Sequence, residues 1–366
     1  MSWLLGCLST TSPEPGVPFV AVTAGRFHSC ALTARHEAYC WGRNAYGALG
    51  DGTTRDSSAP VRVAAAFDFE AITAGFDYTC GIATNGAAYC WGANFNGELG
   101  DGTTTNRTAP VAVAGGLAFR SLSAGEAHTC GITTGGTTYC WGAPLGPAPG
   151  GGVLPNLLRP TALSGPGFKE VSAGYEIACA ITVGGAQYCW GLYPPGVDFA
   201  DSTVPSTAVP EPVGGAVTLR SISAGHKHAC GVAADGRAYC WGRNQTGQVG
   251  DSSRIYANDP VAVAGALTFG SVSAHSPGHS CGVTDSGTAY CWGANHLGQL
   301  GNGSDSTSPV PKPVAGTHAF TDVTTGFNHT CGLTTEGDVY CWGYGGFGQL
   351  GSGTFTDTRQ PQAVRR

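Results

Sequence analysis

Charged side chains are scarce in this sequence. Asp, Glu, Lys and Arg together make up 11% of its 366 residues, and lysine occurs at only three positions. The net charge of −6 argues against a basic surface that binds nucleic acid, because such surfaces concentrate Lys and Arg. We therefore expect no nucleic-acid partner.

Long apolar runs and helical periodicity are also missing. No apolar stretch reaches the roughly 18 residues that a transmembrane helix needs, so the sequence predicts none. No segment of useful length repeats its apolar residues with the period of an amphipathic helix. Glycine (59 residues) and proline (22 residues) are abundant instead, which is typical of many short strands joined by tight turns.

Fourteen of the 15 cysteines form seven pairs, and every pair has the same spacing of ten positions. The pairs are Cys30 and Cys40, Cys80 and Cys90, Cys130 and Cys140, Cys179 and Cys189, Cys230 and Cys240, Cys281 and Cys291, and Cys331 and Cys341. Trp-Gly follows each second cysteine, and the pairs recur every 49 to 51 residues. A period of this length indicates a repeat architecture, and seven similar units usually make one closed body.

The last pair shows why each unit reads as a hairpin with its own disulfide. Thr-Glu-Gly at 335–337 is a three-residue turn with glycine at the position that requires positive φ. That turn pairs Leu333 with Val339, and Cys331 with Cys341. The cysteines then face each other at a non-hydrogen-bonded site, where opposed Cα atoms lie about 4.5 Å apart. This distance lies within the reach of a disulfide.

Zinc is the alternative explanation for so many cysteines. No pair has the two-to-four-residue spacing of a zinc knuckle, so the spacing favours disulfides. Disulfides persist in oxidising compartments. We therefore expect an exported protein, located outside the cell or in the cell envelope.

The N-terminal segment, residues 1–17, contains the one unpaired cysteine. Leu-Leu-Gly-Cys7 resembles the lipobox of bacterial lipoproteins, and the Ser/Thr/Pro-rich stretch after it resembles their flexible tether. Only six residues precede Cys7, too few for a complete signal peptide. Either the sequence begins inside a longer lipoprotein signal and Cys7 is lipidated, which we favour, or the match is chance and Cys7 is a free thiol in a disordered terminus.

Each unit of the remaining chain, 18–366, follows one plan. A short strand ends in Ala-Gly, the paired-cysteine hairpin follows, and a glycine-rich loop leads to a last strand such as 110–113. Four short strands per unit are the content of one propeller blade, and small residues suit the crowded centre of a propeller. The sequence predicts an all-β fold, a single seven-bladed β-propeller of about 50-residue repeats. Whole units at both ends allow the last blade to close without a borrowed strand, but the sequence leaves the way in which the ring closes open.

The turns and loops vary between the units. Six units carry glycine at the hairpin turn, but the first has His36, so we expect that turn to be less relaxed. The loop after Trp-Gly begins with asparagine and ends with Leu-Gly or Val-Gly in four units, at Asn44, Asn94, Asn244 and Asn295, and 345–351 is similar. Units three and four lack this loop sequence, and their Pro-rich segments predict an irregular rim there.

This repeat, Ala-Gly-x-x-His-Thr/Ser-Cys with Tyr-Cys-Trp-Gly-x-Asn-x-x-Gly-Gln-Leu-Gly further on, resembles that of the regulator of chromosome condensation family over about residues 18–364. The resemblance implies a seven-bladed β-propeller. The paired cysteines distinguish this sequence from the eukaryotic nuclear members of the family, and in this feature it is similar to bacterial exported relatives. One related class, beta-lactamase inhibitor protein II, is a secreted propeller that binds an enzyme. The resemblance also implies an alternative function, guanine-nucleotide exchange on a small GTPase, which needs the cytosol or nucleus and which the disulfides oppose.

Two repeated patterns raise the question of a metal. A histidine lies two positions before the first cysteine in five units, at His28, His128, His228, His279 and His329, where the other units have Tyr78 and Ile177. A ring of imidazoles could bind a metal, but a hydrogen bond to neighbouring backbone in each repeat explains the pattern better. Asp-Gly-Thr-Thr at Asp51 and Asp101 lacks the further ligands of a calcium loop and is explained by turn chemistry. We expect no metal and no cofactor.

Catalytic patterns do not stand out. The sequence has no nucleophile elbow or phosphate loop, and Glu170 and Glu176 have no counterparts in other units. We therefore expect no enzyme, although an enzyme with its site at the propeller mouth is a third alternative. The seven tryptophans after the cysteines are expected in the core, because repetition in every blade serves the scaffold.

The variable positions are the best candidates for binding, because the turn after Ala-Gly and the loop after Trp-Gly reach the same face. The predicted face contains Arg26, Phe27, Phe76, Asp77, Glu126, Tyr175, Glu176, His226, Lys227, Phe327, Asn328, Arg43, Tyr46, Phe95, Arg243 and Tyr344, with 275–277, Leu192, Tyr193, His296 and Phe347 nearby. Aromatic residues mixed with arginine are typical of protein-binding hot spots. We expect a monomer that binds a protein, or a glycan, through this variable face; undirected drift of the loops is the alternative.

Overall fold

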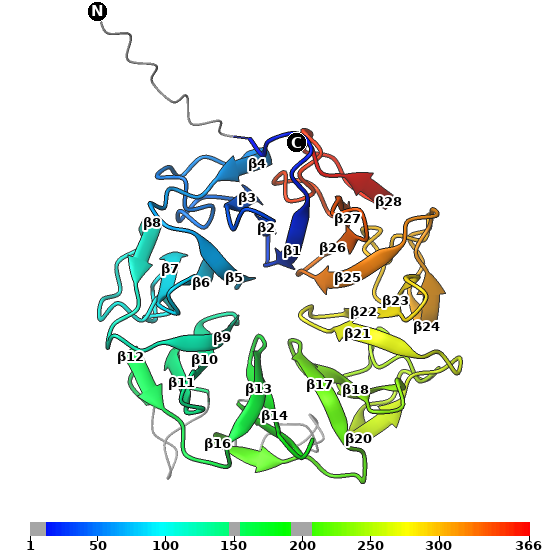
Figure 1. Ribbon diagram of the computed structural model, residues 1–366. Helices are drawn as coiled ribbons and strands as arrows, with labels where there is room; N and C mark the ends of the chain where they lie inside the picture. Colours follow the sequence, from blue (N-terminus) through cyan, green and yellow to red (C-terminus); the bar gives the residue numbers. More distant parts are fainter. Residues whose placement is uncertain (1–11, 146–153, 192–206) are drawn as a thin grey trace, which may run out of the picture.

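Seven four-stranded antiparallel sheets surround a central axis in the computed structural model, which describes residues 12–145, 154–191 and 207–366 (Figure 1). Within each sheet the strands follow chain order from the axis outward, as in β1-β2-β3-β4. These seven four-stranded sheets are the blades of a propeller, which confirms the predicted all-β, seven-bladed β-propeller fold. No helix among the described residues is long and apolar enough to cross a membrane.

The strands of the seven blades have nearly the same lengths. The first three blades consist of β1 Phe19–Ala24, β2 His28–Thr33, β3 Ala38–Gly42 and β4 Ser57–Arg62; β5 Phe69–Ala74, β6 Tyr78–Ala83, β7 Ala88–Gly92 and β8 Arg107–Ala112; and β9 Phe119–Ala124, β10 His128–Thr133, β11 Thr138–Gly142 and β12 Leu157–Ala162. The fourth and fifth consist of β13 Phe168–Ala173, β14 Ile177–Thr182, β15 Gln187–Gly191 and β16 Thr207–Pro212; and β17 Leu219–Ala224, β18 His228–Ala233, β19 Ala238–Gly242 and β20 Ala257–Ala262. The last two consist of β21 Phe269–Ser273, β22 His279–Thr284, β23 Ala289–Gly293 and β24 Ser308–Pro313; and β25 Phe320–Thr325, β26 His329–Thr334, β27 Val339–Gly343 and β28 Thr358–Ala363.

The hairpin register is the predicted one. Leu333 pairs with Val339, and Cys331 with Cys341, across β26 and β27. All seven cysteine pairs form disulfides, with Cα atoms 4.0 to 4.1 Å apart. In the first blade His36 has a φ of 63°, where the other six hairpin turns have glycine, which confirms the expected strain at this turn.

The core lies between the blades and is built around the repeated tryptophans. All seven are at most 2% exposed, as predicted for packing residues. In the second blade, the ring of Phe69 lies 5.6 Å from that of Trp91. A Cβ atom on Gly81 would lie 2.6 Å from the Phe69 ring, so a side chain at this position would have to displace the ring.

The ring closes with the contacts that join the other blades. The amide of Phe69 donates to the carbonyl of His36 over 2.9 Å, and across the closure the amide of Phe19 donates to Gly337 over the same distance. β25–β28 all come from the C-terminal part of the chain, so the last blade borrows no strand, which settles a point that the sequence left open. The guanidinium of Arg366 adds hydrogen bonds to the carbonyls of Val17 and Gly337.

Candidate functional site

The Ala-Gly sequence ends the innermost strand because the blades meet at this point. A Cβ on Gly25 would lie 2.2 Å from the carbonyl oxygen of Gly75 in the next blade, which excludes any side chain. The residue after each glycine donates its amide to the next blade: Arg26 to Gly75, and Phe76 to Gly125. The side chains that follow the glycines are thereby held in a ring around the mouth of the axis.

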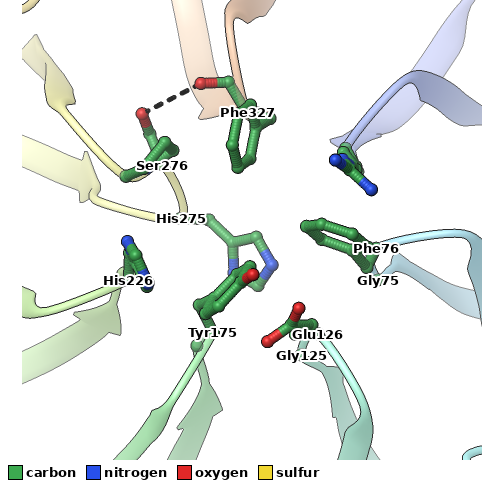
Figure 2. A pocket seen from close by; sticks show the side chains of 13 residues that line it. Gly75, Phe76, Gly125, Glu126, Tyr175, His226, His275, Ser276 and Phe327 are labelled. Carbon is green, nitrogen blue, oxygen red and sulfur yellow. Dashed lines mark hydrogen bonds between the residues drawn. The ribbon is translucent and has the colours of Figure 1, made fainter. Parts of the chain in front are cut away.

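The sixth blade interrupts this glycine ring. Its inner strand is followed by Ala274-His275-Ser276-Pro277-Gly278, one residue longer than in the fifth blade, so a histidine stands where the other blades have glycine. The amide of His226 consequently donates to the carbonyl of Ser276. Figure 2 shows His275 at the centre of the mouth, surrounded by Phe76, Glu126, Tyr175, His226 and Phe327.

The space left at the mouth is small. These residues line a cavity of about 20 Å³, which has room for about one water molecule. Tyr175 contacts its neighbours on both sides: its ring lies 4.0 Å from His226 and 5.3 Å from Phe76. The propeller axis is therefore closed by packed side chains rather than open as a channel.

Burial changes the acid-base properties of the mouth. It raises the pKa of the Glu126 carboxyl to about 7, although the Tyr175 hydroxyl donates toward that carboxyl and favours its charged form. Burial likewise raises the pKa of Tyr175 to about 12 and lowers that of His275 to about 4. Near neutral pH, His275 is therefore uncharged and Glu126 is partly protonated.

Arginines and aromatic rings form a continuous cluster over the seventh, first and second blades. This arginine–aromatic cluster consists of Arg26, Phe27, Arg43, Tyr46, Phe76, Phe95, Phe327, Tyr344 and Phe347. Phe27 lies at its middle, with ring centroids 4.9 Å from Phe347 and 6.1 Å from Phe327. At the outer end Tyr46 meets Phe95, which is 57% exposed. The cluster runs from the axis toward the rim.

The opposite part of the variable face carries ion pairs. Glu176 lies 3.0 Å from the ammonium group of Lys227 and 3.8 Å from His226. Burial alone would raise the pKa of Glu176, but hydrogen bonds from His226 and Lys227 outweigh it and hold the pKa below its ordinary value. Arg243 donates to the side-chain oxygen of Gln245. Asn328 lies partly buried beside the cluster, and its carbonyl accepts the Tyr344 amide.

The repeated histidines have a structural explanation that differs in detail from the expected one. Their rings are buried, and Nε2 of His28 is hydrogen-bonded to the hydroxyl of Thr79 in the next blade, 2.8 Å away. The expected partner was backbone, so that expectation was wrong in detail. The same contact recurs from His228 to Ser280, and from His279 to Thr330, whereas Nε2 of His128 has no hydrogen-bond partner in the described part of the chain. Among the described residues, no three His, Cys, Asp or Glu side chains gather in a way that could hold a metal ion.

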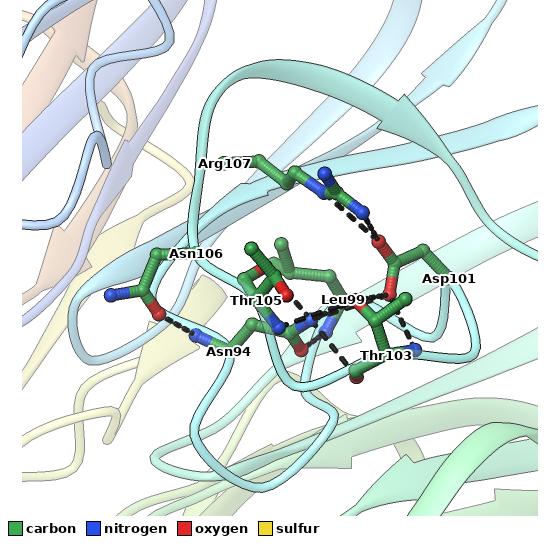
Figure 3. Close-up of polar contacts among 7 residues, drawn as sticks. All are labelled: Asn94, Leu99, Asp101, Thr103, Thr105, Asn106 and Arg107. Carbon is green, nitrogen blue, oxygen red and sulfur yellow. Dashed lines mark hydrogen bonds and ion pairs between the residues drawn. The ribbon is translucent and has the colours of Figure 1, made fainter.

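The Asp-Gly-Thr-Thr segments belong to the loops, as turn chemistry predicts. Asp101 accepts hydrogen bonds from the amide and hydroxyl of Thr103 and pairs with Arg107, 2.8 Å away (Figure 3). Asn94 organises the same loop, because its side-chain oxygen accepts the amide of Leu99 while its NH₂ group donates to Asp101 (Figure 3). Leu99 is completely buried, so this network fixes the loop to the core.

The structure thus gathers all sixteen residues of the predicted face at one end of the blades, although only some of them touch. Sequence reasoning missed two relationships: Asp77 lies between Arg26 and Arg43, and Tyr175 bridges Glu126 and His226. His296 is exposed. Cys7, Leu192 and Tyr193 lie outside the described residues.

The repeats of this chain match known family models. Two family models, both described as the Regulator of chromosome condensation (RCC1) repeat, match the chain, one at residues 19–48, 69–98, 219–248, 271–299 and 320–349 and the other at 35–82, 85–132, 286–333 and 336–366. Together these matches span 19–132, 219–248 and 271–366, which is more than half of the chain.

The curated relatives match over short regions. The E3 ubiquitin-protein ligase HERC2 of Homo sapiens is 31% identical over 96 residues, which are 26% of this chain and 2% of HERC2. The ultraviolet-B receptor UVR8 of Arabidopsis thaliana is 30% identical over 103 residues, 28% of this chain and 23% of UVR8. The chain therefore matches less than a quarter of the length of either relative.

Solved structures match over most of the chain. Prp20p of Saccharomyces cerevisiae has a TM-score of 0.77 at 19% identity, covering 96% of this chain and 88% of Prp20p. Human WBSCR16 has the same TM-score at 16% identity, covering 88% and 87%. At these identities the likeness concerns the fold alone. With the repeat matches and the seven blades taken together, the chain belongs to the regulator of chromosome condensation (RCC1) repeat family.

Proposed function

We propose that this chain is a non-enzymatic binding propeller that engages a protein partner through its variable face, outside the cytosol. The observation that carries the proposal is the arginine–aromatic cluster over the seventh, first and second blades. Aromatic and arginine side chains contribute most of the binding energy in protein interfaces, since they bury large areas with few rotatable bonds. Repeats that serve only the scaffold give no reason for such residues at variable positions.

Proteins of the same fold support a protein as the partner rather than a glycan. One structure with a TM-score of 0.75 shows yeast RCC1 (Prp20) bound to Kap60, and the Prp20p structure is described with its binding to Gsp1p and histones. Both are less than 25% identical to this chain, so they support the mode of action and not the identity of a partner.

The disulfides support an extracellular or cell-envelope location, because a reducing cytosol does not maintain seven of them in one ordinary domain. The ectodomain of the receptor kinase CR4 of Physcomitrella patens has a related fold, with a TM-score of 0.59. Lipidation of Cys7 would add an anchor to the envelope. Intact mass before and after reduction measures both features, since each bridge gains two hydrogens and a lipid adds its own mass.

The partner test uses photocrosslinking with the full chain from its native cells. A benzoylphenylalanine replaces Tyr46, at the outer end of the cluster, or Thr84, an exposed turn residue at the opposite end of the second blade. We expect one discrete protein adduct from position 46, lost when Phe27→Ala is added, and none from position 84. The proposal would be overturned if the adduct formed in equal yield from both positions, or if Phe27→Ala left the yield from position 46 unchanged.

Nucleotide exchange is the second candidate function, because Prp20p shares the fold and is described as binding Gsp1p. It is measured as release of a fluorescent guanine nucleotide from a small GTPase. Stimulated release by the oxidised protein would replace the proposal above with the exchange function.

A further inference from the structure

Two arginines of the first blade, Arg26 and Arg43, share an ion-pair partner, Asp77, but their side chains lack hydrogen-bond partners in the described part of the chain. Neither guanidinium makes a hydrogen bond to any of the residues that the structure describes, and Nε of Arg26 is buried without a hydrogen-bond partner. We propose that Arg26 and Arg43 together form a receptor for a carboxylate of the protein partner, borne by an Asp or Glu next to an apolar side chain. This inference rests on the proposed function and names the chemistry of the partner.

Aromatic rings hold both guanidinium groups in place. Cζ of Arg26 lies 3.9 Å from the ring centroid of Phe76, with Phe27 at 4.6 Å and Phe327 at 5.4 Å. Cζ of Arg43 lies 5.4 Å from the centroid of Phe347 and 5.8 Å from that of Phe27. Stacking of this kind restricts the orientation of a guanidinium before binding, so less entropy is lost when its N–H groups engage a carboxylate.

The charge of the pair is only partly balanced. Both arginines share the single carboxylate of Asp77, at 4.0 Å from Arg26 and 3.5 Å from Arg43. Among the described residues, Glu126 also interacts electrostatically with Arg26, but its carboxyl accepts from Tyr175 and is partly protonated near neutral pH. Two arginines therefore share one nearby carboxylate, and the surplus of positive charge favours an anionic ligand.

A fully paired arginine in the same chain shows the difference. Arg107 donates from Nε and from one terminal nitrogen to the same carboxylate oxygen of Asp101, at 3.0 and 2.8 Å, and so has a hydrogen-bonded carboxylate of its own. Arg43 has no such partner, although it is 26% exposed and surrounded by rings. A carboxylate from outside would give Arg43 the charge-assisted hydrogen bonds that Arg107 already has.

The surroundings define the rest of the ligand. Phe27, Tyr344 and Phe347 lie beside Arg43 and present apolar surface at the same face. A free carboxylate ion would leave that surface in water, whereas a protein loop with an apolar residue beside its acid would cover it. We therefore expect an acidic loop of a protein rather than a small organic acid.

The test selects binders from a disulfide-closed random peptide library displayed on phage, using the oxidised full chain as target. We expect the enriched peptides to compete with one another for the variable face and to contain Asp or Glu beside an apolar residue. Their affinity should fall about 10- to 100-fold for the Arg43→Gln or Arg26→Gln variant. Replacing the acidic residue of the peptide by its amide should weaken binding to the wild type by a similar factor. The same replacement should weaken binding to Arg43→Gln very little further, which is the coupling expected of a direct contact. Arg43→Lys should recover only part of the affinity because it lacks the planar fork.

Arg62→Gln is the matched control, because Arg62 lies in the same blade but pairs with Glu37 at 2.8 Å, away from the cluster. Two results would overturn the carboxylate receptor while leaving the binding face intact. One is a set of peptides that contain no acid but lose binding with Phe27→Ala, and the other is a set whose binding is unchanged by Arg43→Gln. Binders that never compete at this face would count against both proposals. Thermal unfolding of each variant separates loss of binding from loss of folding.

Discussion

The indole nitrogen of Trp91 donates a hydrogen bond to the main-chain carbonyl of Ala48, 2.9 Å away in the preceding blade. The same carbonyl accepts the hydroxyl of Thr79. Equivalent bonds join Trp141 to Glu98, and Trp292 to Gln248. The loop after Trp-Gly of one blade is thus fastened to the tryptophan of the next, which explains why both sequences recur together.

Trp241 provides the contrast, because it follows the fourth blade, whose loop departs from the repeat. It is fully buried like Trp91, yet its indole nitrogen has no hydrogen-bond partner within the described ranges. Within the described ranges, Trp241 therefore lacks the hydrogen bond to the preceding blade that Trp91 has.

We expect Trp91→Phe to destabilise the propeller more than Trp241→Phe does. Both substitutions remove the same buried volume, but only the first removes a hydrogen bond, so the difference should be about 1 kcal/mol. Denaturant unfolding of the two variants under oxidising conditions measures it. Equal losses would show that the indole hydrogen bonds contribute nothing to the contact between blades.

Removal of one disulfide tests what the hairpin bridges contribute. The double variant Cys331→Ala, Cys341→Ala opens a loop with a sequence separation of ten residues. Such a bridge restricts the unfolded chain modestly, so we expect the free energy of unfolding to fall by about 2–3 kcal/mol. The midpoint of denaturant unfolding gives the loss, and the same pair in a second blade is the control for position. An unchanged midpoint would contradict the entropic account.

The hairpins were predictable from the sequence because three constraints coincide in each. Turn length, glycine position and cysteine spacing all select the pairing of Cys331 with Cys341, so one register satisfies them together. The Ala-Gly strands were predictable for a related reason. A repeated small residue indicates close approach of backbone, and the carbonyl of Gly75 does lie where a Cβ of Gly25 would be.

Contacts between blades were not predictable in the same way. The partner of His28 is Thr79, 51 positions away, and the period alone gives no indication that a hydroxyl rather than backbone meets the ring. The position of Asp77 between Arg26 and Arg43 likewise depends on how neighbouring blades are rotated against each other. Sequence identified which residues reach the variable face, but side-chain packing decides which of them touch.

Two turn glycines allow the closure of the ring to be tested. Gly136 and Gly337 have nearly equal φ angles, 85° and 82°. A Cβ on Gly136 would meet nothing within 4 Å, whereas a Cβ on Gly337 would lie 2.3 Å from Cβ of Pro18 in the first blade.

We therefore expect Gly136→Ala to cost about 1–2 kcal/mol, which is the left-handed backbone penalty alone. Gly337→Ala should cost clearly more, since the seventh blade must also move away from the first. Thermal and denaturant unfolding compare the two variants. A loss at Gly337 no larger than that at Gly136 would show that the junction between the terminal blades is loose.

The buried histidines make the stability of the propeller depend on pH. Burial lowers the pKa of His28 to about 4, from the ordinary value of 6.5. The folded state therefore resists protonation that the unfolded chain accepts. The stabilisation due to neutral His28 is complete above pH 6.5 and is lost progressively as the pH falls toward 4, by about 1.4 kcal/mol per pH unit.

The second blade shows how to remove that dependence, because Tyr78 occupies the equivalent position and its hydroxyl is hydrogen-bonded to Thr129 over 2.9 Å. Between pH 6.5 and 4, we expect His28→Tyr to remove about one proton from the difference in proton binding between the unfolded and folded states. Its free energy of unfolding should therefore fall by about 2 kcal/mol less than that of the wild type between pH 7 and pH 5. The reciprocal variant Tyr78→His should steepen the decline by a similar amount, because it places a further imidazole in a buried site. Urea unfolding at pH 7, 6 and 5 measures all three proteins. Parallel pH profiles would contradict the burial of a neutral imidazole at this position, since only a group whose protonation differs between the folded and unfolded states can change the slope.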